Sequence, residues 1–334
     1  MPRPETTLTL AAAEALVIAA LQRCRTSPAN AASVARALVM AEAEGLTGHG
    51  LTRVPSYAAQ AKNGKVDGTA EPVVEHVTPA LARIDAAFGF AFPALEKAVE
   101  AVAEAAPMMG IAAAAIRRSH HCGVAGHHVE RLAEKGLVGL LFANTPAAIA
   151  PWGGKTGVFG TNPIAFACPL PGEPPIVVDL SLSKVARGAL LSAKQKGQPI
   201  PEGWALDRDG SPTTDIHAAL AGTMVPLGEA KGTALALMVE LLAAGLTGAK
   251  YAADASSFLD DKGNPPATGQ LLIALDPHLI GGEATIAHFG RLADQVRAQE
   301  GTRLPGARRI ALRQKARDSG LVVATSLVTE IEAL

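Results

Sequence analysis

The sequence predicts a mixed α/β fold with two compact lobes that share an interface. The chain has 334 residues, of which 49% are hydrophobic and only 4% aromatic. A chain of this length can bury enough apolar surface for two lobes. Its opening residues carry apolar side chains at helical spacing, whereas short apolar segments bounded by glycine or proline, which are typical of buried strands, recur through the middle.

Periodicity and breaker residues indicate where the individual elements lie. Helical spacing predicts helices at residues 9–24, 27–44, 92–105, 229–244 and 286–299. Short apolar segments predict strands at residues 72–84, 111–116, 138–142, 164–167, 176–180 and 271–274. Ser27 followed by Pro28 is a typical helix start, and Gly45 ends that helix. Asp209-Gly210 predicts a tight turn, and residues 303–309 an arginine-bearing loop.

Charge and cysteine content exclude several classes of protein. The 30 basic and 31 acidic residues nearly cancel, and no basic stripe suggests nucleic acid as a partner. Cys24, Cys122 and Cys168 are odd in number and far apart, which is typical of a reducing compartment. Glu5 and Glu14 interrupt the apolar opening, and no apolar run reaches the ~18 residues that span a membrane. We therefore expect a cytoplasmic protein that does not bind membranes.

The first candidate for chemistry is a histidine between two glycines. If this region is helical, His49, Arg53 and Tyr57 project from one face, because they are spaced by four residues. An arginine one turn from a histidine can grip a carboxylate while the imidazole acts as a general acid. A polar helix start with a solvated histidine is the alternative.

The second candidate is the histidine cluster formed by His120, His121, His127 and His128. Imidazole is a common metal ligand, but the spacing matches neither a histidine pair on a zinc-binding helix nor a cysteine-containing zinc site. A metal site is therefore not expected. A glycine-flanked turn that meets a cofactor through backbone N–H groups and one imidazole is the favoured interpretation, and structural histidines at a lobe interface are the alternative.

Known phosphate-binding motifs are missing from the sequence. No G-x-G-x-x-G follows a strand, and the Gly154-Lys155-Thr156 triplet lacks the earlier glycine of a P-loop, because position 149 is isoleucine. Lys231 nevertheless falls in the first turn of a predicted helix, where a cation opposes the helix dipole unless an anion offsets it. We expect either a phosphate near Lys231 or a tolerated surface lysine. The arginines of residues 303–309 could likewise contact an anion or form a solvated basic loop.

Several long segments together resemble one known family. They are residues 49–57 (H-G-x-x-R-x-P-x-Y), 121–126, 159–166, 178–181, 204–214 and 231–242. The chain resembles the malate/L-lactate dehydrogenase-like NAD(P)H oxidoreductases, which are unrelated to Rossmann dehydrogenases. Within them it is most similar to the Δ1-piperideine-2-carboxylate/Δ1-pyrroline-2-carboxylate reductases.

The resemblance implies a non-Rossmann NAD(P)-binding fold of mixed α/β (α+β) class with a mostly antiparallel cofactor-binding sheet. It also implies a helical lobe built from both ends of the chain, which we expect to span residues 1–70 with 285–334. An interleaved core of residues 71–284 would bind cofactor and substrate. The implied assembly is a homodimer whose active site lies near the subunit interface.

The resemblance also assigns site residues. It implies that His49 is the proton donor, that Arg53 anchors the substrate carboxylate, and that Thr161 and Arg187-Gly188 contact the substrate. The implied cofactor contacts are His121, Cys122, Gly123, Val124, Ala125, Asp179, Leu180, Ser181, Ala230, Lys231, Pro305, Gly306, Ala307, Arg308 and Arg309.

Two positions depart from the family pattern. Gly48 replaces a serine before the histidine, and Ala189 replaces an aspartate after Arg187-Gly188. In the resembled reductases these two residues form a relay with the histidine. A cyclic imine can enter already protonated and needs less acid catalysis than a ketone, for which a general acid contributes roughly 10² to 10⁴-fold.

We therefore expect a reductase that uses NADPH, with NADH possible, to convert Δ1-pyrroline-2-carboxylate to L-proline and Δ1-piperideine-2-carboxylate to L-pipecolate. Three alternatives stay open. They are an NAD(P)-dependent 2-ketoacid reductase of the malate/L-lactate type, a metal-dependent hydrolase or lyase built on the histidines, and a binding protein without catalytic activity.

Overall fold

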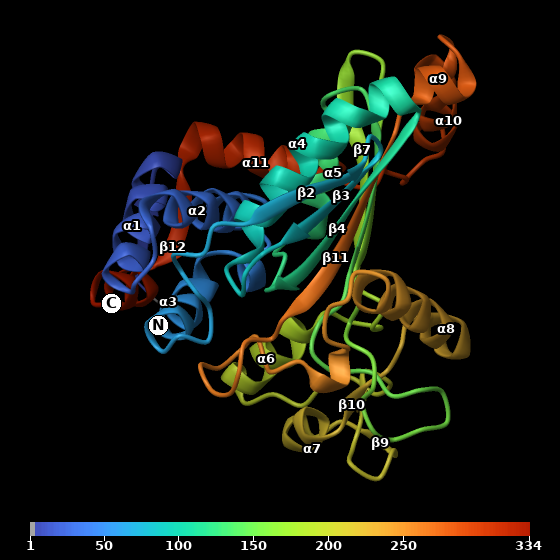
Figure 1. Ribbon diagram of the computed structural model, residues 1–334. Coiled ribbons are helices and arrows are strands. Elements are labelled where there is room, and N and C mark those ends of the chain that lie inside the picture. The colour runs from blue at the N-terminus through green and yellow to red at the C-terminus, as the bar shows by residue number, and fades with distance from the viewer. Residues whose placement is uncertain (1–3) are drawn as a thin grey trace.

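The computed structural model describes residues 4–334, and a seven-stranded sheet with strand order β2-β3-β4-β11-β5-β6-β7 forms its centre (Figure 1). Neighbouring strands are antiparallel except β3 and β4, which are parallel. The strands of this sheet are β2 (Val73–Thr78), β3 (Leu81–Asp85), β4 (Ile111–Ser119), β5 (Val138–Ala143), β6 (Ile164–Leu170), β7 (Glu173–Leu180) and β11 (Thr268–Leu275). The predicted mostly antiparallel sheet is thus confirmed.

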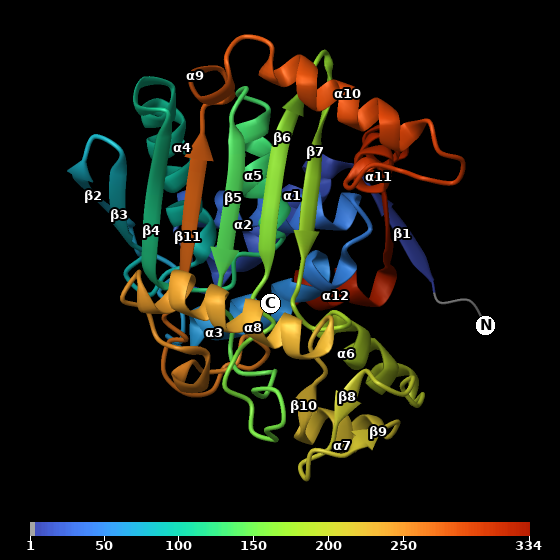
Figure 2. The ribbon, with the colours of Figure 1, turned by 90° about the vertical axis from the view of Figure 1, so that its right-hand side faces the viewer.

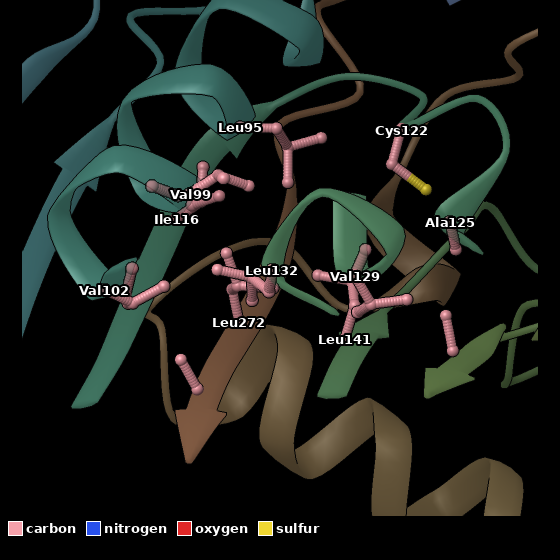
Figure 3. Close-up of a cluster of buried hydrophobic side chains, with 14 of the residues drawn as sticks. Leu95, Val99, Val102, Ile116, Cys122, Ala125, Val129, Leu132, Leu141 and Leu272 are labelled. Atoms are coloured by element: carbon pink, nitrogen blue, oxygen red, sulfur yellow. The ribbon is translucent and has the colours of Figure 1, made fainter. Parts of the chain in front are cut away.

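Two helices, α4 (Ala91–Met109) and α5 (Ala125–Ala133), cover one face of this sheet, behind it in Figure 2. Their apolar sides meet the sheet in a buried cluster that includes Leu95, Val129 and Leu272 (Figure 3). The same cluster contains Cys122, in the turn between β4 and α5, and Ala125, the first residue of α5. The packed core therefore supports that turn from behind.

The two ends of the chain form a helical lobe beside the sheet (Figure 1). The strands β1 (Glu5–Leu8) and β12 (Leu321–Ala324) pair antiparallel, and α1, α2, α3 and α12 pack around them. The helices are α1 (Leu10–Arg23), α2 (Pro28–Ala43), α3 (Val54–Lys62), α11 (Ala307–Ser319) and α12 (Thr325–Glu332). As expected from Ser27, its side chain caps α2 by accepting a hydrogen bond from the Asn30 N–H.

A smaller unit lies below the sheet in both ribbon views. It contains a three-stranded sheet of order β10-β8-β9, in which the predicted turn at Asp209-Gly210 joins β8 to β9. Its elements are α6 (Arg187–Lys196), β8 (Ala205–Leu206), β9 (Pro212–Thr213), α7 (Ile216–Ala221), β10 (Thr223–Met224) and α8 (Glu229–Glu240). The two remaining helices, α9 (Pro277–Gly281) and α10 (Thr285–Arg297), lie at the far end of the sheet, where α10 packs against β6.

Most predicted elements lie where expected, and two predictions were wrong in detail. Residues 303–309 are not entirely loop, because Gly306 takes a left-handed conformation and α11 begins at Ala307. The helix predicted for residues 229–244 changes to a π-helix at Leu241–Gly245. The lobe boundaries at residues 70 and 285 stay a prediction. No helix among residues 4–334 is long and apolar enough to cross a membrane.

Candidate active site

A pocket of about 790 Å³ is lined by residues from the helical lobe, the sheet and the smaller unit. Most of the predicted site residues line it. They are His49, Arg53, His121, Cys122, Gly123, Val124, Ala125, Thr161, Asp179, Leu180, Ser181, Arg187, Gly188, Pro305, Gly306 and Arg309. Segments from across the whole chain therefore meet at one cavity, as the resemblance implies.

Four predicted cofactor contacts lie elsewhere. Ala230 and Lys231 line a second pocket of about 1330 Å³, together with Lys155 and Lys184. Lys231 occupies the first turn of α8, as predicted, and is exposed. Ala307 and Arg308 are also exposed and do not line the first pocket. Within one subunit the structure thus separates Ala230 and Lys231 from the other predicted contacts.

Tight turns rather than one continuous helix present His49 and Arg53. Two 3₁₀ turns, Thr47–His49 and Leu51–Arg53, precede α3, so the single helix considered for this region does not form. The Leu51 N–H donates to Glu42 Oε2 at 2.8 Å, and a Cβ at Gly50 would lie 2.2 Å from the same oxygen. A side chain at position 50 would therefore displace the Glu42 carboxylate from the Leu51 N–H.

Two imidazoles stack at the wall of the pocket. The rings of His49 and His121 are 5.3 Å apart with an interplanar angle of 22°. Behind them, Tyr57 Oη lies 2.6 Å from His121 Nδ1, a hydrogen bond inside the protein. Burial, the Arg53 charge and the His127 charge lower the pKa of His49 to about 4, so the imidazole is neutral at pH 7. Burial and the Arg53 charge also depress the pKa of His121.

Two guanidinium groups border the same cavity. Arg53 Nε donates to the Gly48 carbonyl at 2.7 Å, and Arg187 Nε is buried without a hydrogen-bond partner. Burial and the charge of Arg53 lower the pKa of Arg187. Neither arginine forms an ion pair with a carboxylate in the part of the chain that the structure describes. The pocket therefore holds two positive charges that the protein does not neutralise.

A network of charged groups lies on the α5 side of the pocket. Asp179 Oδ2 accepts a hydrogen bond from the Gly126 N–H at 2.7 Å, and burial raises the pKa of this carboxyl group. Arg309 Nη1 lies 3.9 Å from Asp179 Oδ2 and 3.6 Å from Glu44 Oε2, but it makes no hydrogen bond. Burial would raise the pKa of Glu44, but the His127 hydrogen bond and nearby arginines lower it.

The histidines of the cluster have different partners. His127 Nε2 lies 2.9 Å from Glu44 Oε2, and His128 Nε2 lies 3.0 Å from the Cys122 carbonyl. His120 is buried among aromatic rings, with neither ring nitrogen hydrogen-bonded. Among residues 4–334, no group of three or more His, Cys, Asp and Glu side chains is placed to hold a metal ion.

Sequence reasoning missed several residues of the pocket wall. Thr145 Oγ1 accepts a hydrogen bond from the Thr161 N–H at 2.9 Å and lies 3.2 Å from the Thr161 hydroxyl. Phe258 contacts His121 at a ring distance of 5.2 Å and closes another side. No local pattern identifies these two residues. Glu240, which follows the apolar residues 234–239 at the end of α8, was a usable signal, and its carboxylate is buried behind the pocket.

Comparison with known proteins identifies the family of the chain. The chain matches the malate/L-lactate dehydrogenase family over residues 8–332. It is 51% identical to the (2R)-3-sulfolactate dehydrogenase (NADP(+)) of Chromohalobacter salexigens over 327 residues, which cover 98% of this chain and 97% of that protein. It is 41% identical to the Δ1-pyrroline-2-carboxylate/Δ1-piperideine-2-carboxylate reductase of Pseudomonas putida, with 93% of this chain and 91% of that protein covered.

A solved structure agrees over the same length. The Δ1-piperideine-2-carboxylate reductase of Pseudomonas syringae pv. tomato superposes with a TM-score of 0.93 at 38% identity, covering 98% of this chain and 99% of that one. The chain therefore belongs to the malate/L-lactate dehydrogenase family, as the sequence motifs predict, and it is an oxidoreductase.

Proposed function

We propose that this oxidoreductase transfers hydride between NADPH and C2 of a small 2-oxo acid that carries a second anionic group, as 3-sulfopyruvate and oxaloacetate do. The observation that carries this proposal is the pair Arg53 and Arg187, which border one pocket without carboxylate partners. Two like charges that face one cavity are unfavourable unless bound anions offset them. A carboxylate on Arg53 and a second anion on Arg187 would neutralise both.

The comparisons support a doubly charged substrate. The relative with 51% identity is named for 3-sulfolactate, which carries a carboxylate and a sulfonate. The relatives named for cyclic imines have lower identity, 41% in the case of the Pseudomonas putida enzyme. A protonated cyclic imine carries only one carboxylate and would add a third positive charge near Arg53 and Arg187. The electrostatics of the pocket therefore favour the dianion.

The residues of the pocket can bind and protonate such a substrate. Arg53 can hold the C1 carboxylate through two N–H groups, and Thr161 and the Gly188 backbone can contact the remaining oxygens. His49, next to Arg53, can move the proton at the C2 oxygen. Burial is the main cause of the low His49 pKa and the Arg53 charge the second, so a carboxylate bound to Arg53 would raise this pKa by cancelling part of the second cause.

The residues on the α5 side of the pocket fit a nicotinamide dinucleotide. The Gly126 N–H in the first turn of α5 already donates to Asp179 Oδ2, whereas buried Arg309 Nη1 beside it lacks a hydrogen bond and can receive a phosphate oxygen. We assign the turn of His121 to Ala125, the strand end of Asp179 to Ser181 and Pro305-Gly306 to the same cofactor. When bound, NADPH supplies the hydride. The arginines of this region favour NADPH over NADH.

A cyclic imine is the second candidate substrate. It is favoured by the reductase relatives and by the absent relay, since Gly48 and Ala189 carry neither the serine nor the aspartate of the family pattern. A Cβ at Gly48 would meet no atom within 4 Å, so the loss of the serine does not reflect lack of space. In this reading His49 would orient or protonate the ring nitrogen.

We also propose a homodimer with the active site near the subunit interface. Ala230 and Lys231 lie in the second pocket, and a second subunit offers a way to bring Lys231 of the partner subunit to the first pocket. The α8 region exposes a run of apolar side chains suited to such an interface, namely Leu235, Leu237, Met238 and Leu241. The three buried free cysteines are consistent with a cytoplasmic location.

The test follows NADPH absorbance at several pH values with 3-sulfopyruvate, oxaloacetate, pyruvate and both cyclic imine carboxylates. The proposal predicts the highest kcat/KM for a dianionic 2-oxo acid and a much lower value for pyruvate. Fast imine turnover with slow reduction of both dianions would instead establish the second candidate. No NADPH oxidation with any of them would contradict both.

A further inference from the structure

The carboxylate of Glu240 is buried, with the residue only 3% exposed. Glu240 is the last residue of α8, and the π-helix Leu241–Gly245 begins immediately after it. Burying a charged carboxylate is costly unless several donors hydrogen-bond to it. A glutamate at such a position therefore indicates a specific arrangement of donors around it.

Three neutral donors from three separate segments bind this carboxylate. The Asn144 side-chain amide donates to Oε1 at 3.1 Å, and the Ala252 N–H donates to the same oxygen at 2.6 Å. The Asn162 side-chain amide donates to Oε2 at 2.7 Å. One residue thus ties together the end of β5, the turn before β6 and the segment before β11. Hydrogen bonds to an ionised acceptor are about twice as strong as neutral ones.

Each of these segments lines the first pocket at or next to the residue that hydrogen-bonds to Glu240. Thr145 and Thr161 line the pocket next to the two asparagines, and Ala252 lines it directly. Asn162 has a positive φ of 38°, which is uncommon for a residue other than glycine. Its side chain also accepts from the Thr145 N–H at 3.3 Å, so the amide bridges both threonine-bearing turns.

We propose that Glu240 is a positioning residue that sets the Thr161 hydroxyl and the adjacent pocket wall for substrate binding without touching the substrate. The proposal rests on the proposed function, because it takes the pocket to be the substrate site and Thr161 to be a substrate contact. The chain of contacts runs from Glu240 through Asn162 to the turn of Thr161, whose hydroxyl is 3.2 Å from that of Thr145.

Replacement by glutamine separates this role from simple space filling. Glu240→Gln keeps the shape of the side chain but replaces one carboxylate oxygen with an NH₂ group, which is a donor. Because both carboxylate oxygens of Glu240 accept hydrogen bonds, this NH₂ group faces another donor in either orientation of the amide. The amide can satisfy Asn144 and Ala252 through its remaining oxygen, and Asn162 Nδ2 then keeps only its hydrogen bond to the Ala236 carbonyl at 3.0 Å. We therefore expect the turn of residues 160–163 to be held less firmly while the rest of the fold is retained.

The experiment compares Glu240→Gln with Glu283→Gln, a matched change at a side chain that is 96% exposed. We expect Glu240→Gln to raise the KM for the 2-oxo acid about tenfold, the equivalent of roughly 1.4 kcal/mol. The affinity for NADPH, measured by fluorescence titration, should stay within about twofold. Amide hydrogen exchange should become faster at residues 160–162 and 250–253, a readout that needs no turnover. Glu283→Gln should leave all three unchanged.

A double-mutant cycle with Thr161→Val tests the path of the effect. If Glu240 acts through Thr161, the double variant has the KM of Thr161→Val alone, so the two changes are not additive. Additive effects on KM, or equal losses in NADPH affinity, would show a general structural role and overturn the proposal. If the wild type reduces none of the substrates, the proposed function fails, whereas the hydrogen-exchange result still decides whether Glu240 holds the turn.

Discussion

Two pairs of arginines lie near the pocket and differ in their partners. Arg53 and Arg187 border the cavity without an ion pair in the described part of the chain, and burial together with the Arg53 charge lowers the pKa of Arg187. Arg313 forms ion pairs with Glu44 and Glu130. Arg309 Nη1 also lies near Glu44, at 3.6 Å from Oε2. The first pair is available to the substrate, whereas Arg313 joins parts of the protein and Arg309 Nη1, which makes no hydrogen bond, stays available to the cofactor.

The second pair connects the helical lobe to the core. Arg313 of α11 contacts Glu44 after α2 at 3.4 Å and Glu130 of α5 at 2.5 Å. These groups are nearly buried, so each charge is matched inside the protein. Partners, rather than residue type, therefore separate binding arginines from structural ones.

The largest effect is expected for Arg53→Met. Without the guanidinium the substrate carboxylate loses its bidentate contact, and kcat/KM should fall about 10³-fold, or roughly 4 kcal/mol. The melting temperature should not fall, because the change removes repulsion with Arg187. Steady-state kinetics and thermal unfolding measure both, with Arg36→Met on the surface as the control. Wild-type kcat/KM would eliminate the anchoring role.

The opposite pattern is expected for Arg313→Met. This variant leaves Glu130 buried without its cation, which should lower the free energy of unfolding by about 3 kcal/mol. Denaturant titration measures the loss, and Arg297→Met, which removes a surface pair with Glu173, should change stability little. The KM for substrate should stay close to the wild-type value. A large rise in KM with unchanged stability would reverse the assignment of the two pairs.

A selective effect is expected for Arg187→Met. If Arg187 binds the second anion, kcat/KM for a dianionic 2-oxo acid should fall about 30-fold, or roughly 2 kcal/mol, and that for pyruvate should change little. The ratio of the two values is the measurement, since a general loss of activity cancels in it. Equal losses of kcat/KM for both substrates would mean that Arg187 does not bind the second anionic group.

His120 differs from both pairs of arginines, because its ring nitrogens have no hydrogen-bond partner and it does not line the first pocket. Burial and the charges of Lys65 and Arg53 lower its pKa to about 3, below the unfolded value of 6.5. The unfolded state therefore binds a proton first as the pH falls below 6.5, and the protein loses stability towards pH 3. His120→Phe should remove roughly 1 to 2 kcal/mol of the loss between pH 7 and pH 5 in denaturant titrations. An unchanged pH dependence would contradict this.

The sequence predicted the parts of the site that carry local chemistry. His49 and Arg53 are four residues apart, and the turn of residues 121–125 lies within one stretch, so their pattern is readable before the fold is known. The sheet strands were recognisable because each is a short apolar segment with breakers at its ends. The start of α11 was missed because Pro305-Gly306 resembles a loop, although Gly306 is the residue before the helix.

Other parts of the site depend on contacts between distant segments. The donors to Glu240 come from residues 144, 162 and 252, and no spacing rule connects them. Phe258 reaches the pocket from an irregular segment, where apolar periodicity gives no signal. The separation of Lys231 from the first pocket follows from the placement of α8, which only the tertiary structure reveals.

The most direct test of the central claim is a crystal structure of the enzyme with NADPH and 3-sulfolactate. We expect the carboxylate to bind Arg53, the sulfonate to bind Arg187, and the C2 hydroxyl to lie within hydrogen-bond distance of His49. A sulfonate bound elsewhere, with Arg187 facing solvent or the cofactor, would contradict the assignment of the two free arginines to one doubly charged substrate.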